Sequence, residues 1–514
     1  MKGALILAIA GVCCKIFGAF FRIPLSNILG SEGMGLYQMV FPIYSLFLVF
    51  VTGGISAAEA KLVAEAKATG NLCNIKRIFS LSLFMMLILG LFFSIALFVL
   101  SPVLADLSGN SLAAKGFRMI SFAILFSALI AAIRGYFQGF ENMVPTAFSQ
   151  IIEQLIKLIF GLTFASVFVR FGISDGVAGA VFGVLLSEVI SFVVLAIYAK
   201  KKISVSKKNQ YENSGGAKNN KDIFISLFSY SFPMMLGAII LPLSGAIDSF
   251  LVVNLLKFSG FSQTIATSLF GISSGMVNSL INLPAIVSAS LAISIVPSIS
   301  FSFAKKDVTN VKNKIILAIK IVLIIVAPCV AGFLVLAPNI MQMLYPTLLM
   351  EKREVFEVAV TLLRFSALNI FYIGFLQITT AILQGVSKIY LPVLNLFFAV
   401  IVKVALTYAL VLNPSLNILG TSLASAVCFM IASTLNIAYL KKITQFRLPF
   451  KKVCLPLLFS GIIAAFIALF DNVAKLFFSN TISTFLAIIL AIIIYLFFVF
   501  TSKVVEKKEI EKVL

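Results

Sequence analysis

Histidine and tryptophan are absent from this chain of 514 residues, and charged residues are scarce, at 11%. The missing histidine removes the commonest general base and the commonest metal ligand. The scarcity of charge excludes an ordinary soluble domain, because such domains carry roughly 25% charged residues. Hydrophobic residues make up 61% of the chain, which indicates a membrane protein.

Cysteine is rare as well, and it offers no chemistry. The six cysteines show none of the spacings of a metal site or a redox pair, so we read them as small apolar packing residues. Neither a metal nor a cofactor is expected. The cysteines are Cys13, Cys14, Cys73, Cys329, Cys428 and Cys454.

Long apolar runs recur along the whole chain. Runs of about 20 apolar residues are typical of membrane-spanning helices, and they are continuous rather than alternating, which favours helices over a barrel. We read the first run as a spanning helix and not as a cleavable signal peptide. The predicted helices are 4–29, 36–58, 78–104, 118–137, 144–169, 177–199, 223–254, 267–302, 315–337, 355–383, 389–412, 417–440, 453–471 and 480–502.

The formal net charge of +21 is explained by the distribution of the basic residues. They lie mostly in alternate loops, as the positive-inside rule requires of cytoplasmic loops. This pattern argues against nucleic-acid binding. It predicts a multi-pass protein of the cytoplasmic membrane with both termini in the cytoplasm.

Two basic segments, 200–222 and 441–452, divide the predicted helices into blocks of six, six and two. The two six-helix blocks resemble each other in sequence. The segment 135–157, GYFQGFENMVPTAFSQIIEQLIK, aligns with 381–403, AILQGVSKIYLPVLNLFFAVIVK. Because six spans return the chain to its starting side, the blocks repeat in parallel, an architecture of transporters with the substrate site between the halves. We predict an N-terminal lobe 1–205, a cytoplasmic linker 206–222, a C-terminal lobe 223–445, and two last helices with a cytoplasmic tail, 446–514.

Charged side chains inside membrane spans are functional candidates by default. Basic candidates for substrate binding outnumber the acidic ones, and a cationic cavity attracts an anion such as a pyrophosphate. Some have structural alternatives: Glu153 and Lys157 are spaced to form an ion pair, and Glu59 lies at a helix end where snorkelling explains it equally well. The basic candidates are Lys15, Arg22, Arg134, Lys157 and Lys403, and the candidates for ion coupling are Asp248, Glu153 and Glu59.

Motifs of soluble enzymes are missing. The sequence contains no Walker A motif and no GxSxG elbow, and no acidic cluster stands in a predicted outer loop. We therefore expect a protein that is not an enzyme.

Several segments resemble a known family, the stage V sporulation protein B / polysaccharide transporter branch of the MOP (MATE-like) flippase superfamily, to which lipid II flippases are related. The resemblance runs from residue 3 to about 440. It is carried by residues 3–65, by RGYFQGFENMVPTAFSQIIEQ (134–154), by LPLSGAIDSFLVVNLL (241–256), by NLPAIVSASLAISIVPSIS (282–300) and by LQGVSKIYLPVLNL (383–396).

The resemblance implies an all-α polytopic protein of about 14 transmembrane helices, with two pseudo-symmetric six-helix lobes and two C-terminal helices that extend a groove for a lipid tail. It implies basic residues on the first helix, where Lys15 and Arg22 stand. Glu59 departs from the pattern, which has a smaller uncharged residue there.

The leading hypothesis is a flippase for an undecaprenyl-pyrophosphate-linked saccharide, a precursor of peptidoglycan or another polysaccharide in cell-wall or spore-cortex synthesis. It would work by alternating access, driven by membrane potential or a coupled cation. Its partners would be the lipid-linked saccharide and membrane lipids, and it would act as a monomer, with the cell-wall synthesis machinery as a further partner. The alternatives are a cation-coupled multidrug exporter, a membrane-embedded polymerase or transferase, and a structural member of a synthesis complex.

The predicted topology can be tested with reporter fusions. A green fluorescent protein fused after Asn213 should fluoresce, and alkaline phosphatase fused there should be inactive, because the Lys-rich linker is predicted to be cytoplasmic. The reverse is expected after Pro346, in the predicted outer loop 338–354. Active phosphatase after Asn213 would contradict the orientation.

Overall fold

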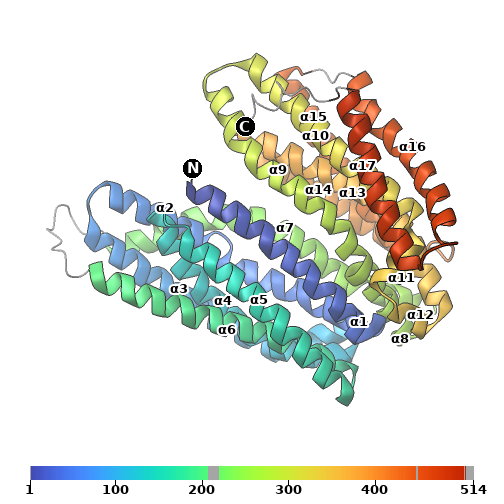
Figure 1. Ribbon diagram of the computed structural model, residues 1–514. Helices are drawn as coiled ribbons and strands as arrows, with labels where there is room; N and C mark the ends of the chain where they lie inside the picture. Colours follow the sequence, from blue (N-terminus) through green and yellow to red (C-terminus); the bar gives the residue numbers. More distant parts are fainter. Residues whose placement is uncertain (1, 207–218, 447–449, 503, 505–514) are drawn as a thin grey trace. The chain divides into compact units, whose positions relative to one another are not determined.

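The computed structural model describes residues 2–206, 219–446, 450–502 and 504, and within these ranges all regular secondary structure is helical. Figure 1 shows long helices joined by short connections. Thirteen helical segments are long and apolar enough to cross a membrane. The structure thus confirms the predicted all-α polytopic fold.

The first of these segments, Ile9–Ala68, is 60 residues long and comprises two spans. Helix α1 (Lys2–Thr52) is interrupted at Gly30, whose φ of 69° is not helical. The ring centroids of Phe21 and Tyr37 lie 6.3 Å apart, although 16 residues of straight helix would separate them by about 24 Å. The chain therefore folds back at Gly30, and the total agrees with the predicted fourteen spans.

Two compact units divide the chain. The first comprises Met1–Lys257 and Ser262–Gly271, and the second comprises Phe258–Phe261 and Ile272–Leu514. The helices of the first unit are α1, α2 (Ile55–Ala68), α3 (Leu72–Leu107), η1 (Ser111–Ala113), α4 (Ala114–Gly139), α5 (Val144–Phe168), η2 (Val169–Phe171), α6 (Ile173–Ser206), α7 (Asn220–Phe258) and α8 (Gln263–Phe270).

The remaining described helices belong to the second unit, except that the first residue of η3, Gly271, is part of the first unit. These helices are η3 (Gly271–Val277), α9 (Asn278–Ala304), α10 (Val308–Val335), α11 (Ala337–Leu344), α12 (Thr347–Glu351), α13 (Arg353–Gly385), α14 (Tyr390–Val411), α15 (Leu419–Thr444), α16 (Phe450–Ala474) and α17 (Asn480–Thr501).

Helix α7 packs with the first unit. The Ser249 hydroxyl donates to the carbonyl of Gln38 at 3.1 Å, and the Asn254 amide donates to the carbonyl of Leu107 at 2.6 Å. Most of the predicted linker 206–222 lies outside the described residues, so the predicted partition into a lobe 1–205, a linker and a lobe 223–445 stays a prediction.

The predicted helix 36–58 is wrong at its end. Helix α1 ends at Thr52, and Gly54 has a φ of 94° and precedes the separate helix α2. Only glycine adopts this conformation easily, and a Cβ at Gly54 would lie 2.3 Å from the carbonyl oxygen of Ser231. Glu59 consequently stands in the second turn of a new helix and not at the end of the preceding span.

Helices α5 and α6 approach each other at the level of their backbones. A Cβ added at Gly183 of α6 would lie 2.3 Å from the Cα of Gly161 in α5. Small residues allow such close packing between membrane helices, where burial of apolar surface gives little drive for association. This crossing fixes the two helices that carry much of the polar network described below.

In the second unit, amide and hydroxyl side chains join neighbouring helices. The Asn395 amide of α14 donates to the Asn436 side chain of α15 at 2.9 Å, and Asn436 donates to Thr379 of α13 at 3.2 Å. Hydrogen bonds of this kind hold membrane helices together.

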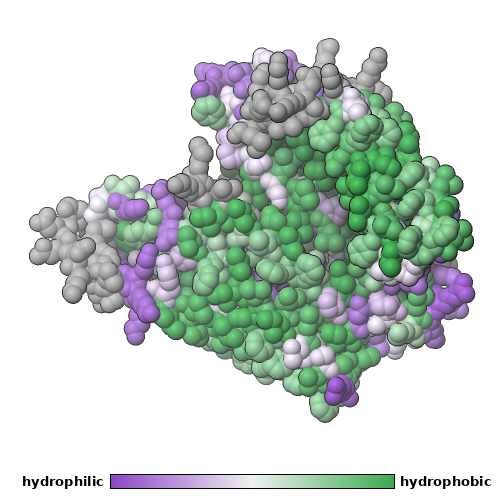
Figure 2. All heavy atoms as spheres, viewed as in Figure 1, coloured by the Kyte–Doolittle hydropathy of each residue, from purple (hydrophilic) through white to green (hydrophobic). Residues whose placement is uncertain are grey.

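The surface of the helices is apolar along most of their length. Figure 2 shows hydrophobic residues over the visible helix faces, and hydrophilic residues gather toward the helix ends. Helix α3, for example, exposes Phe92, Ile95 and Val99. Apolar patches of this extent are incompatible with a water-exposed surface, and the protein is therefore a multi-pass membrane protein.

We expect Gly183→Ala to destabilise the first unit by about 1–3 kcal/mol, because the added methyl group meets rigid backbone and forces α5 and α6 apart. Gly332→Ala is the matched control, since nothing lies within 4 Å of a Cβ added there, and it should be neutral or slightly stabilising. Thermal unfolding of both variants in detergent measures the difference. Equal melting temperatures would show that the close crossing contributes nothing.

Candidate functional site

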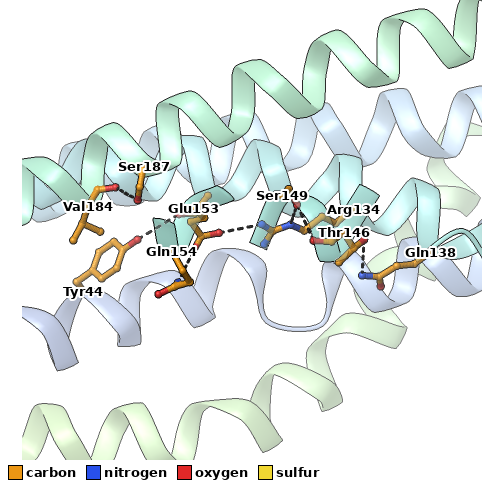
Figure 3. A network of polar contacts seen from close by, with 10 residues as sticks. Tyr44, Arg134, Gln138, Thr146, Ser149, Glu153, Gln154, Val184 and Ser187 are labelled. Atoms are coloured by element: carbon orange, nitrogen blue, oxygen red, sulfur yellow. Dashed lines mark hydrogen bonds and ion pairs between the residues drawn. The ribbon is translucent and has the colours of Figure 1, made fainter. Parts of the chain in front are cut away.

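Four helices of the first unit, α1, α4, α5 and α6, contribute side chains to a network of polar contacts in its interior. Figure 3 shows that Tyr44 comes from α1 and Arg134 from α4, and that Thr146, Ser149 and Glu153 follow one another along α5. The sequence spacing of 146, 149 and 153 places the three α5 residues on one helix face. That face lies toward α4, whose Arg134 contacts Ser149 and Glu153.

Arg134 is the central residue of this network. Its Nη2 lies 3.0 Å from Oε2 of Glu153, and its Nε donates to the Ser149 hydroxyl at 2.9 Å. The two charged side chains are only 16% and 19% exposed. Ser149 in turn donates to the carbonyl of Thr146 at 2.9 Å. The guanidinium is therefore held in orientation by one charged and one neutral partner.

Glu153 is also fixed from its own helix. The Gln154 amide donates to its second oxygen, Oε1, at 3.3 Å. At the other end of the network, the Gln138 amide lies 3.4 Å from the Thr146 hydroxyl. Both carboxylate oxygens thus have donors, which reduces the cost of keeping the charge away from water.

Lys157 lies near Glu153, the carboxylate that its spacing suggested as a partner, but within the described structure the two form no ion pair. The ion pair of Glu153 is with Arg134, so the predicted pair four residues along α5 is wrong. Instead the Lys157 ammonium lies 5.1 Å from the ring centroid of Phe21 and 5.0 Å from that of Phe41. An aromatic face attracts a cation through its quadrupole without neutralising it.

Arg22 approaches the same ring. Its Cζ lies 5.8 Å from the centroid of Phe41, and Phe41 stacks on Tyr37 with centroids 5.6 Å apart. Among the described residues, no carboxylate forms an ion pair with Arg22 or Lys157. Two cations from different helices, α1 and α5, are thus gathered around one aromatic ring.

Sequence reasoning missed Glu188 of α6. This side chain is 7% exposed, and it lies close to Ser127 of α4. The Ser127 hydroxyl lies 3.3 Å from the hydroxyl of Tyr44. A lone acid within an apolar run was the signal that selected Asp248, and the same signal was present at Glu188.

Three of the other predicted residues lie outside this network. Lys15 is exposed on the first half of α1, Asp248 is half-buried on α7, and Lys403 is buried on α14 of the second unit. In the described part of the chain, no three acidic or cysteine side chains cluster as metal ligands.

Glu59 occupies a separate position between α2 and α4. It is fully buried, and within the described structure neither carboxylate oxygen has a hydrogen-bond partner of normal geometry. A Cβ at Gly135 would lie 2.8 Å from Oε2, so the glycine is needed to admit the carboxyl group. The snorkelling alternative is wrong for Glu59, because its carboxyl group is enclosed.

The network brings three basic and two acidic side chains into one part of the first unit. These are Arg22, Arg134, Lys157, Glu153 and Glu188. Arg134 and Glu153 compensate each other, whereas Arg22 and Lys157 keep their hydrogen-bond donors for another acceptor. The arrangement favours binding of an anion with several oxygens over binding of a cation.

Breaking the ion pair should cost stability. Arg134→Gln leaves Glu153 buried without its cation, and we expect a loss of about 3 kcal/mol. The double variant Arg134→Gln/Glu153→Gln should regain much of it, because no unpaired charge remains. The exposed pair Arg353 and Glu357 is the control, and its removal should leave the melting temperature unchanged. Additive effects at Arg134 and Glu153 in a double-mutant cycle would contradict the pairing.

Comparisons with known proteins agree with this structure. The stage V sporulation protein B of Bacillus subtilis (strain 168) is 27% identical over 456 residues, covering 88% of this chain and 86% of the relative. The lipid II flippase MurJ of the same organism is 26% identical over 495 residues, covering 93% and 90%.

Solved structures share the fold. The lipid II flippase MurJ in an inward closed conformation matches with a TM-score of 0.73 at 17% identity, covering 97% of this chain and 99% of that one. An inward-facing multidrug resistance MATE transporter of the MOP superfamily matches with a TM-score of 0.66 at 16% identity, covering 84% and 94%. The predicted MATE/MOP-like fold is confirmed.

The family follows from the sequence match. A family model described as "Polysaccharide biosynthesis protein" matches residues 1–303, which confirms the resemblance stated from the sequence. Because this match covers more than half of the chain, and because the fold is that of transporters of the MOP superfamily, the chain belongs to the polysaccharide biosynthesis protein family.

Proposed function

We propose that this protein is a flippase that carries an undecaprenyl-pyrophosphate-linked saccharide across the cytoplasmic membrane by alternating access. The saccharide is a precursor of peptidoglycan or another polysaccharide, in cell-wall or spore-cortex synthesis. Both termini lie in the cytoplasm, as the distribution of Lys and Arg predicts. The protein acts as a monomer and without enzymatic chemistry.

The observation that carries this proposal is the placement of Arg22 and Lys157 around Phe41. The ring stabilises each cation by about 0.5–2 kcal/mol, far less than the cost of a charge held at bilayer depth without a partner. A pyrophosphate supplies the missing negative charge. It also accepts several hydrogen bonds at once, to which a guanidinium is well matched.

Arg134 has a different role in this proposal. Arg134 is bound to Glu153 and Ser149, so it fixes the position of α5 against α4 and neutralises the charge of Glu153. Its contact with the substrate is secondary. Lys15 and Lys403 stay predicted contacts of the headgroup. Any coupling to a proton or sodium ion falls in this proposal to Asp248, Glu153 and Glu59, and we add the buried Glu188 to these candidates.

The relatives support this substrate class. The family model names polysaccharide biosynthesis, and a relative that is similar over 93% of this chain is named a lipid II flippase. The multidrug alternative shares the fold, but a pocket for cationic drugs needs unpaired acids. The described interior of the first unit does contain two acids without an ion-pair partner, Glu59 and Glu188, but the charged residues gathered around Phe41 are the cations Arg22 and Lys157.

The test is transport by the purified chain in liposomes. Arg22→Ala should reduce flipping of a fluorescent undecaprenyl-pyrophosphate-linked disaccharide at least about tenfold, because removal of one charge-assisted contact costs roughly 1.5–3 kcal/mol. Its level in the membrane should be unchanged. Arg353→Ala, an exposed site on α13, is the matched control and should transport normally.

Two outcomes would contradict the proposal. Full transport by Arg22→Ala would exclude the phosphate role of that residue. Export of ethidium by the wild-type chain, with no movement of the lipid-linked disaccharide, would favour the multidrug alternative. In cells, depletion of the protein should cause one lipid-linked intermediate to accumulate in the inner leaflet, and its saccharide identifies the substrate.

A further inference from the structure

A groove of about 380 Å³ runs between α5 and α6 in the first unit. Its volume lies within the range of ligand sites, roughly 300–1,000 Å³. It lies beside the polar network and is not part of the anion site around Phe41. Its lining includes Val144, Phe148, Ser149, Val194, Tyr198 and Lys201.

The walls of the groove are apolar and accessible from the hydrocarbon. Phe148 is 57% exposed and Ile197 is 54% exposed, so these side chains form the outer edges. The floor is closed by buried residues, among them Leu195, which packs with Ile133 and Phe137 of α4. An apolar groove with open edges fits a flexible hydrocarbon chain and offers nothing to a polar solute.

One end of the groove carries positive charge. Lys201 lines it, and Lys200 and Lys202 are exposed beside it. The Lys202 ammonium lies 5.7 Å from the ring of Tyr198, so an aromatic side chain and cations meet at one level, as they do at membrane interfaces. Of the described residues that line the groove, none is acidic.

We propose that this groove binds an anionic phospholipid, with one acyl chain between α5 and α6 and the phosphate on Lys201. Basic sites beside membrane helices on the cytoplasmic side recognise anionic headgroups, and this end of α6 leads into the segment predicted to be cytoplasmic. The groove is far smaller than an undecaprenyl chain, so the expected occupant is a membrane phospholipid and not the transported lipid.

The groove also touches the charged network. Ser149 is 1% exposed, lines the groove, and accepts the hydrogen bond of Arg134 Nε at 2.9 Å. A chain seated in the groove thus packs against the residue that orients Arg134. Binding of a phospholipid in this groove does not require a transported saccharide, so its test is independent of the flippase function.

The absence of tryptophan allows a single-tryptophan reporter. Phe148→Trp places the only indole of the chain on the wall of the groove, and Phe92→Trp places it on an exposed face of α3 as the control. Each full-length variant is reconstituted with brominated phosphatidylglycerol or brominated phosphatidylcholine, which quench the indole on contact. Should Phe148→Trp fail to fold, Val144→Trp reports on the same groove.

We expect phosphatidylglycerol to quench the groove reporter at about fivefold lower mole fraction than phosphatidylcholine, since one lysine at the surface contributes about 1 kcal/mol. Lys201→Ala in the reporter background should abolish this preference. Lys200→Ala removes the same charge one residue away, at a position that does not line the groove, and should retain it. The reporter on α3 should show no preference.

Three results would overturn the proposal. Equal quenching by both lipids at Phe148→Trp would show an unselective surface. Equal effects of Lys200→Ala and Lys201→Ala on the lipid preference would show only a general attraction of anionic lipid to the basic end of α6. Relief of quenching by undecaprenyl phosphate at lower mole fraction than by unbrominated phosphatidylglycerol would show that the groove holds the prenyl chain.

Discussion

The ion pair between Arg134 and Glu153 is the interaction on which the interior of the first unit depends. Charge placed between membrane helices cannot be solvated by the hydrocarbon around it, so its partners must come from the protein. Glu153 receives donors from Arg134 and Gln154, and Arg134 has a second partner in Ser149. Through these contacts the positions of α4 and α5 are set together.

Two positive charges of the same unit, those of Arg22 and Lys157, have no ion-pair partner among the described residues. Arg22 and Lys157 both lie near the ring of Phe41, and the quadrupole of a ring balances only a fraction of a full charge. A site that was neutral in itself would have no electrostatic reason to bind an anion. The difference between the paired Arg134 and the two cations around Phe41 separates the structural role of Arg134 from the binding role that we propose for Arg22 and Lys157.

Backbone proximity gives this arrangement its rigidity. Gly183 lets α6 approach Gly161 of α5, and Gly135 admits the carboxyl group of Glu59 against α4. The groove beside Ser149 lies between the same two helices, near the start of α5 and the end of α6. One pair of helices thus provides both a close crossing and a groove.

The sequence by itself determined the number of spans, the all-helical class and the family, because hydropathy and motif spacing are local properties of the chain. Only the tertiary structure decided the partner of Glu153, the burial of Glu188, the reversal at Gly30 and the separate helix that carries Glu59. Each depends on which faces of distant helices meet. Within one helix, spacing favoured Lys157 as the partner of Glu153. The rotation of α5 against α4 instead brought Arg134 to the carboxylate and turned Lys157 toward the rings of Phe21 and Phe41.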